Sequence, residues 1–368
     1  MRKFLNLCLA IVVFAGVFLL AVQAFPPTAY GEPRYVYIGG NPIGITVNAD
    51  GLMVTGTVPV ETPRGTAYPL EGSGIGKGDV IKALDGIPVG NLYDFRRRIA
   101  ASEGAVMFTV QRDGKTFDTA VYPVEDRASG QKKAGLILKE DVGGIGTLTF
   151  VTEDGNYGAL GHHVFDVETG LCDELQGGKI FDVEIEGVIK GEAGKAGGLQ
   201  ASINRLSVPV GINASNTDIG IYGKYTGERR GEKIRVAGKG EARPGKAKIL
   251  TTTEGTQPEL YDIEIVKSVP QSQSEEKGLV LLVTDKRLLE KAGGIVQGMS
   301  GSPIIQNGVL VGAVTHVFVS DPTRGYGVHA RFMLENADGV YLAPQPRAYG
   351  NEPSLSYYNH RERQKEAA

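Results

Sequence analysis

The chain has 368 residues, which is enough for two domains of ordinary size and additional terminal segments. Hydrophobic residues make up 41% and charged residues 22%, so a packed core is feasible and a wholly disordered chain is excluded. A net charge of −3 gives no overall field for holding nucleic acid, and two cysteines, one in the apolar N-terminal run, exclude a disulfide framework and a zinc site built on cysteines.

The N-terminus has the layout of a targeting segment. Met1-Arg2-Lys3 carries positive charge, residues 4–22 are almost entirely apolar, and small residues follow at Val22-Gln23-Ala24. The apolar run is about as long as a bilayer requires. We therefore expect residues 1–24 to be a signal peptide or an uncleaved membrane anchor. Residues 25–35 are then a linker, and the rest of the chain is exported.

Short apolar runs alternate with turns through residues 36–124. Ile43–Val47 is predicted to be a strand after a Gly-rich loop, Gly78-Asp79-Val80-Ile81 leads into a turn, and residues 93–100 have helical spacing. The segment resembles a PDZ domain, whose backbone N–H groups form an anion-binding loop beside which a peptide adds as a strand. A small packing domain without a ligand is the alternative interpretation.

The PDZ resemblance implies where that loop lies and what it binds. The loop residues are Pro42, Ile43, Gly44 and Ile45. The ligand is expected to be the C-terminus of a peptide or a segment of this protein's own chain. Residues 125–134 are polar, contain a Ser-Gly pair and are predicted to be a linker.

Strand-like runs separated by glycines dominate from residue 135 onward. No long amphipathic helix interrupts them, which argues against a parallel sheet with crossover helices. The 52 glycines of the chain fit many tight turns, so an antiparallel barrel or sandwich is favoured. We place this second domain at residues 135–345 and a polar C-terminal tail at residues 346–368.

The segment Gly298-Met299-Ser300-Gly301-Ser302-Pro303 carries the clearest chemical signal. Glycines on both sides of Ser300 permit a sharp turn that exposes its hydroxyl. The same turn can direct the N–H groups of Gly298 and Ser300 into one space, which is the geometry of an oxyanion hole. An ordinary turn is the alternative for this run taken alone.

A serine hydroxyl becomes a good nucleophile only beside a base, and histidine is scarce in this chain. His162 is the best candidate for the base, with its neighbour His163 as the alternative. Asp285 is the first candidate for the carboxylate that orients the imidazole, and Asp166 and Asp182 are alternatives. The sequence has no HExxH motif, which excludes a zincin-type metalloprotease. His162-His163 with Asp166 is the alternative of a partial metal site, but the spacing indicates no further ligand, so we expect no metal and no organic cofactor.

The turn at residues 298–303 is similar to the nucleophile turn of chymotrypsin-fold serine peptidases. More specifically, the chain resembles the SpoIVB-type sporulation peptidases of endospore-forming bacteria. Five stretches carry the resemblance: residues 143–150, 158–162, 293–303, 312–318 and 321–327.

This resemblance implies a mostly β protein in which an export segment and a PDZ-like α/β domain precede a chymotrypsin-like antiparallel double β-barrel. It also implies His162, Asp285 and Ser300 as the catalytic triad. Thr315 and His316 follow the strand after Ser300 and are candidate substrate contacts.

The function implied by the resemblance is that of an exported serine endopeptidase in sporulation signalling. Such an enzyme acts in the intermembrane space of the forespore, where it cleaves a membrane-embedded regulator of an intramembrane metalloprotease so that a pro-sigma factor is processed. Self-cleavage is also implied. Two alternatives are an exported PDZ quality-control protease and an inert PDZ-based adaptor that binds a membrane partner.

Overall fold

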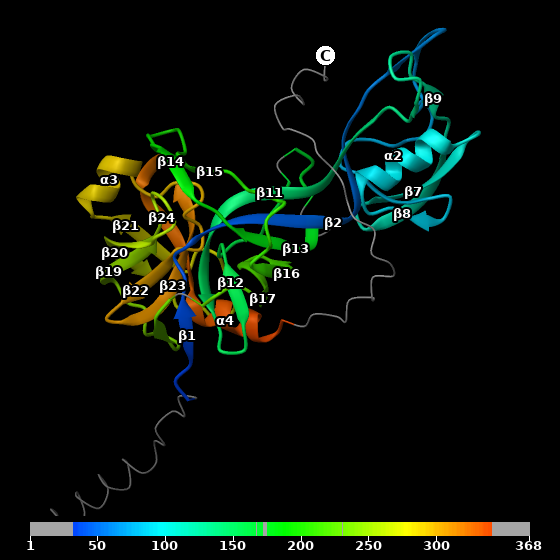
Figure 1. The fold of residues 1–368 in the computed structure, drawn as a ribbon. Coiled ribbons are helices and arrows are strands. Elements are labelled where there is room, and N and C mark those ends of the chain that lie inside the picture. Colours follow the sequence, from blue (N-terminus) through cyan, green and yellow to red (C-terminus); the bar gives the residue numbers. More distant parts are fainter. Residues whose placement is uncertain (1–31, 167, 172–174, 230, 341–368) are drawn as a thin grey trace, which may run out of the picture.

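The computed structural model describes residues 32–340 except 167, 172–174 and 230 (Figure 1). The predicted export segment and the C-terminal tail therefore lie outside the described residues. Strands dominate the described part, and they form two barrels and a separate α/β module. No helix within the described part is both long enough and apolar enough to cross a bilayer.

The first barrel closes through six antiparallel pairings. Its strands, in the order in which each pairs with the next, are β2 (Pro42–Thr57), β11 (Leu136–Val151), β12 (Asn156–Ala159), β17 (Gly220–Tyr225), β16 (Gly211–Thr217) and β13 (Leu175–Asp182), which returns to β2. Alternate residues of β2, including Ile43, Ile45 and Val47, are buried in the core of this barrel because side chains alternate across a strand.

The second barrel closes in the same way. Its strands are β19 (Gly245–Thr251), β20 (Glu259–Ser268), β21 (Leu279–Val283), β24 (Asp321–His329), β23 (Val309–Phe318) and β22 (Pro303–Gln306), which returns to β19. In β20, Tyr261, Ile263 and Ile265 are buried while the residues between them are exposed. Helix α3 (Lys286–Ala292) lies between β21 and the turn that precedes β22.

Two short strands and one helix join the barrels. Strand β1 (Tyr35–Ile38) pairs with β11 and with β18 (Lys233–Val236), and β18 pairs in parallel with β23 of the second barrel. Helix α4 (Ala330–Asp338) buries Phe332 and Met333 in a core that also contains residues of both barrels. Two closed antiparallel barrels joined in this manner form the chymotrypsin-like architecture that was expected.

The α/β module lies between β2 and β11 in the sequence. We call residues 50–140 the inserted module. Its elements, besides the outer halves of β2 and β11, are β3 (Val60–Thr62), β4 (Gly65–Ala67), β5 (Val80–Leu84), β6 (Ile87–Pro88), α2 (Leu92–Ala101), β7 (Val106–Arg112), β8 (Lys115–Val121), β9 (Val124–Glu125) and β10 (Lys132–Lys133). It has a hydrophobic core of its own.

The helix of the module agrees with its sequence pattern. Phe95 and Ile99 are the buried residues of α2, as their spacing predicts. The side chain of Asn91 accepts a hydrogen bond from the N–H of Asp94 and so caps the start of the helix.

Strands β2 and β11 connect the module to the first barrel. They pair from Leu136 opposite Thr57 to Thr147 opposite Pro42, with two irregularities on the way. Figure 1 shows the two strands running side by side from the barrel to the module. A further hairpin, β14 (Ile185–Ile189) with β15 (Gly198–Ala201), lies beside α3.

This pairing corrects two expectations. Residues 42–49 belong to the first barrel and residues 35–38 to β1, so the expected boundaries at 36–124 and 135–345 do not separate the two units. Residues 43–45 are not a loop, because they pair with β11 on one side and with β13 on the other. Pro42, Ile43, Gly44 and Ile45 therefore have no free strand edge for a peptide. The physical reason is that all four residues are buried and the backbone edges of residues 43–45 are already paired on both sides.

We predict that Leu52→Ala destabilises the protein by about 2–5 kcal/mol, because Leu52 is fully buried in the core of the module. Urea unfolding followed by circular dichroism measures this change. Leu206→Ala is the matched control, since Leu206 is 89% exposed and its truncation should change the free energy of unfolding by less than about 0.5 kcal/mol. Equal effects in the two variants would contradict the packing described here.

Candidate active site

The two residues expected to do the chemistry come from different barrels. His162 follows β12 of the first barrel, and Ser300 lies in the turn between α3 and β22 of the second. Both side chains are half-buried. The structure therefore places the base and the nucleophile at the junction of the barrels, where neither barrel alone could supply the site.

Two glycines allow these segments to approach each other. A Cβ on Gly301 would lie 2.1 Å from the carbonyl oxygen of Thr147 and 2.5 Å from the nitrogen of Leu160, two residues before His162. Gly161 has a φ of +76°, and a Cβ there would press against the Thr315 side chain. A side chain at Gly301 would separate the serine turn from the histidine loop, and one at Gly161 would push that loop away from β23.

Hydrogen bonds fix every carbonyl of the serine turn from 298 to 301. The side chain of Thr147 donates to Gly298 O at 2.9 Å, and its N–H donates to Ser300 O at 2.9 Å. The Thr149 hydroxyl donates to Gly301 O at 2.8 Å, and the N–H of Ser302 donates to Met299 O. Strand β11 of the first barrel thus holds the nucleophile turn of the second.

The donors of the turn are not all used. The N–H of Met299 bonds to Val296 O, and the N–H of Gly301 bonds to Val314 O. Among the described residues, no group accepts from the N–H of Gly298 or of Ser300. These are the two donors expected to form an oxyanion hole, and they are held in place while remaining available to a ligand.

The hydroxyl of Ser300 has a specific partner in this structure. It donates to the carbonyl oxygen of Thr315 at 2.7 Å, and within the described part of the chain it makes no hydrogen bond to His162. The ring of His162 packs against the ring of His316, with centroids 4.7 Å apart. Base and nucleophile therefore contact the neighbouring residues 315 and 316 of β23, and rotation of the Ser300 side chain is needed to join them.

His162 lies in a buried environment that disfavours its charged form. Its pKa is lowered to about 4. Burial is the largest cause and the nearby imidazoles of His316 and His163 act in the same direction, whereas a hydrogen bond to the backbone oxygen of His163 and the charge of Glu276 act in the opposite direction. That hydrogen bond joins Nδ1 of His162 to His163 O at 2.7 Å. His162 is therefore neutral at physiological pH, as a proton acceptor must be.

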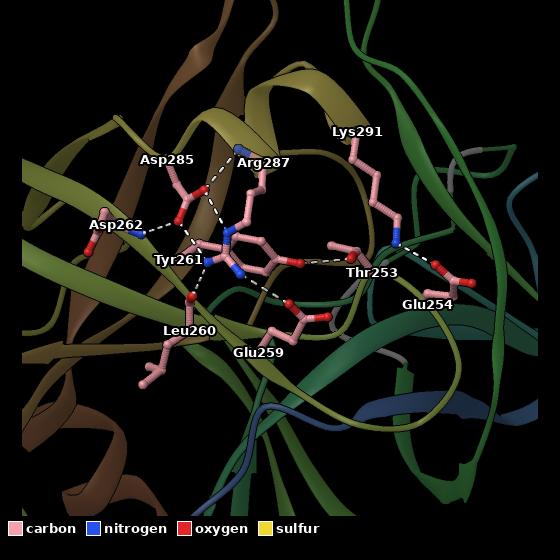
Figure 2. A network of polar contacts seen from close by, with 9 residues as sticks. All are labelled: Thr253, Glu254, Glu259, Leu260, Tyr261, Asp262, Asp285, Arg287 and Lys291. Atoms are coloured by element: carbon pink, nitrogen blue, oxygen red, sulfur yellow. Dashed lines mark hydrogen bonds and ion pairs between the residues drawn. The ribbon is translucent and has the colours of Figure 1, made fainter.

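Asp285 does not lie beside His162. Its carboxylate caps α3 by accepting from the N–H of Arg287, accepts from the N–H of Asp262 and pairs with the Arg287 guanidinium at 2.9 Å (Figure 2). The guanidinium lowers the pKa of Asp285 to about 2. The expectation that Asp285 orients the imidazole is corrected for this structure, because both of its oxygens are used at the start of α3.

The two alternative carboxylates, Asp166 and Asp182, make no hydrogen bond to His162 that the structure describes. Asp166 is buried, pairs with Lys139 at 2.9 Å and accepts hydrogen bonds from Thr169. Asp182 is exposed at the end of β13, opposite Ile43. The hydrogen bond that orients Nδ1 of His162 here comes from the backbone rather than from a carboxylate.

The two candidate substrate contacts differ in exposure. The side chain of Thr315 is buried and donates to the backbone oxygen of Glu276 at 3.0 Å, so a contact with substrate would have to come from its backbone, and the expected contact stays a prediction. The side chain of His316 is 41% exposed and remains a candidate.

Sequence reasoning missed three residues of the site. Thr147 and Thr149 alternate along β11 and face the turn, but a Thr-x-Thr strand pattern by itself indicates only β structure. Glu276 approaches His163 and His316 from a polar loop that has no recognisable motif. In the described ranges, no group of three or more His, Cys, Asp or Glu residues is arranged to hold a metal ion.

Comparison with known proteins gives one family match. The SpoIVB peptidase S55 family matches residues 130–334, which is more than half of the chain. No curated protein matches the chain. Among solved structures, the chain is similar to Rv3671c from M. tuberculosis H37Rv, described as an inactive form of a serine-to-alanine mutant. The TM-score is 0.29 and the identity 12%, covering 54% of this chain and 84% of that one.

We predict that the reaction of Ser300 with a fluorophosphonate is level from neutral pH down to about pH 5 and falls as the pH drops through about 4. The reason is that His162 accepts the proton only when neutral, and burial lowers its pKa to about 4. Labelling rates across pH, with folding checked by circular dichroism at each point, measure this. A midpoint near the ordinary histidine pKa of 6.5 would contradict the assignment.

We predict that Asp285→Asn leaves the labelling rate within about twofold of the parent, since asparagine also caps helices and Asp285 does not contact His162. Loss of the ion pair with Arg287 should lower the free energy of unfolding by about 1 kcal/mol. Asp262→Asn, which removes an exposed ion pair with Lys248, is the matched control. A loss of about 10⁴ in rate, typical of a triad carboxylate, would show that Asp285 acts in the reaction.

Proposed function

The chain belongs to the SpoIVB peptidase S55 family and is a serine peptidase of sporulation, and on this premise we propose that it is an exported endopeptidase of sporulation signalling. The substrate we propose is a membrane-embedded regulator of an intramembrane metalloprotease. Its cleavage would allow a pro-sigma factor to be processed. The proposed site of action is the intermembrane space of the forespore, and self-cleavage is part of the proposal.

One observation carries the catalytic part of the proposal. The turn that contains Ser300 has all four carbonyls from 298 to 301 bonded, while the N–H groups of Gly298 and Ser300 donate to no acceptor among the described residues. A turn that had only a structural role would have no need to keep two neighbouring donors available. Such donors suit a developing oxyanion.

We propose the following reaction on this geometry. The Ser300 hydroxyl leaves Thr315 O, gives its proton to His162 and forms a bond with the scissile carbonyl carbon. The carbonyl oxygen becomes an oxyanion that accepts hydrogen bonds from Gly298 and Ser300 N–H. His162 then donates the proton to the leaving amine, and water hydrolyses the acyl-enzyme by the same steps.

The inserted module contributes substrate or partner binding in this proposal. The PDZ-like identity of the module remains a prediction, and residues 42–45 do not form its binding loop. Two strands join the module to the peptidase barrel, so a peptide bound to the module would be held at a defined distance from Ser300.

We predict that the chain from residue 25 onward reacts with a fluorophosphonate probe and cleaves itself over hours at neutral pH, whereas its Ser300→Ala variant does neither. The mass of each purified protein and of its fragments measures both activities. The reason is that the alanine variant lacks the nucleophile while keeping the fold.

Ser302→Ala is the matched control for this test. Ser302 is buried in the same turn, where its hydroxyl bonds to Thr251, and it should retain labelling because it has no role in the reaction. Labelling of the Ser300→Ala variant, or equal loss in both variants, would contradict Ser300 as the nucleophile. Indiscriminate digestion of denatured casein would contradict the signalling role and support a quality-control protease.

A further inference from the structure

A carboxylate lies against the imidazoles that surround the proposed base. Glu276 belongs to the loop between β20 and β21. One of its oxygens is 3.4 Å from Nδ1 of His163, and the other is 4.0 Å from Nδ1 of His316. His163 adjoins His162 in the chain, and His316 packs against the His162 ring. Glu276 therefore faces the two imidazoles that flank the base.

The two imidazoles that Glu276 faces are incompletely bonded. Nδ1 of His163 and Nδ1 of His316 are inaccessible to solvent and have no hydrogen-bond partner among the described residues. Buried polar atoms without partners are rare and costly in folded proteins. A negative charge within ion-pair distance of both nitrogens compensates for this when a proton enters the cluster.

The loop that carries Glu276 is anchored in its N-terminal half and at Glu276 itself. Arg331 donates to Gln271 O at 2.6 Å, and the ring of His329 bonds to Val269 O at 3.1 Å. The backbone oxygen of Glu276 accepts from the Thr315 hydroxyl, and the backbone oxygen of Thr315 accepts from Ser300. The position of Glu276 is thus fixed relative to the nucleophile.

Other charges near the cluster are weaker candidates. The carboxylate of Asp218, in the turn between β16 and β17, is 4.0 Å from Nδ1 of His163, but its side chain is 94% exposed, so water screens it. The side chain of Glu276 is only 23% exposed. The pKa of His316 is lowered by burial, by the positive charge of Lys277 and by the charge of His163. Lys277 therefore acts against the effect of Glu276 on the cluster.

We propose that Glu276 is a positioning residue for the peptidase reaction, which holds the flanking imidazoles of His163 and His316 and stabilises the positive charge that His162 acquires from Ser300. The inference rests on the proposed function, because it requires His162 to be the base. It assigns electrostatic support of the imidazolium to the loop between β20 and β21.

The proposal predicts a specific loss in Glu276→Gln. Glutamine has the same shape but no charge, so the imidazolium of His162 is destabilised. The Glu276 charge favours the protonated form of His162. A nearby opposite charge shifts a pKa by about 1–3 units, so the labelling rate on the neutral plateau should fall by about tenfold or more. The midpoint of the acid limb should also move to lower pH, since the Glu276 charge raises the pKa of His162.

The experiment compares fluorophosphonate labelling rates across pH for the parent and three variants. Glu276→Asp keeps the charge and should recover most of the rate. Glu275→Gln is the matched control, because Glu275 is an exposed neighbour in the same loop and should behave as the parent. Thermal unfolding at neutral pH checks that all proteins are folded.

Three results would overturn the proposal. They are an unchanged plateau and midpoint in Glu276→Gln, an equal loss in Glu276→Asp, and an equal loss in Glu275→Gln. The parent and Ser300→Ala separate this failure from a failure of the proposed function. If the parent labels and Ser300→Ala does not, while Glu276→Gln matches the parent, only the role of Glu276 is rejected. If Ser300→Ala labels as the parent does, the proposed function itself is rejected.

Discussion

The antiparallel pairing of β2 with β11 is the interaction on which the remainder of the molecule depends. It closes the first barrel, and its outer half forms part of the inserted module. Its inner end positions Thr147, and Thr149 follows two residues further along β11; the backbone and side-chain groups of these two threonines bind carbonyls of the serine turn. A displacement of β11 would therefore disturb the barrel, the module and the nucleophile at once.

The site combines a polar turn whose acceptors are all satisfied with a set of imidazoles in a poorly solvated environment. Burial keeps His162 neutral and lowers the pKa of His316 as well. In such surroundings the proton transferred from Ser300 interacts more strongly with neighbouring dipoles and charges than it would in water. This explains why the placement of a single partly buried carboxylate matters more than the many exposed ion pairs elsewhere on the surface.

Local patterns in the sequence predicted the parts of the structure that local physics controls. Spacing identified α2 through Phe95 and Ile99, and the glycines around Ser300 identified the turn. Pairing across long sequence separations was beyond such patterns. An apolar alternation such as Ile43–Val47 fits equally well in a module or in a barrel. An aspartate just before a helix, as at Asp285, is as consistent with a cap as with a catalytic role.

Strands β2 and β11 each run without a break from the first barrel into the module, and this decides how the chain divides into domains. The module is inserted into one hairpin of the peptidase barrel, so the first barrel is built from two separate stretches of chain. A fragment that starts at residue 135 would lack β2 and leave β11 and β13 as two open edges, which invite aggregation. Thr57 and Leu136 are already cross-strand partners. A short turn that replaces the module between them would therefore leave the first barrel closed.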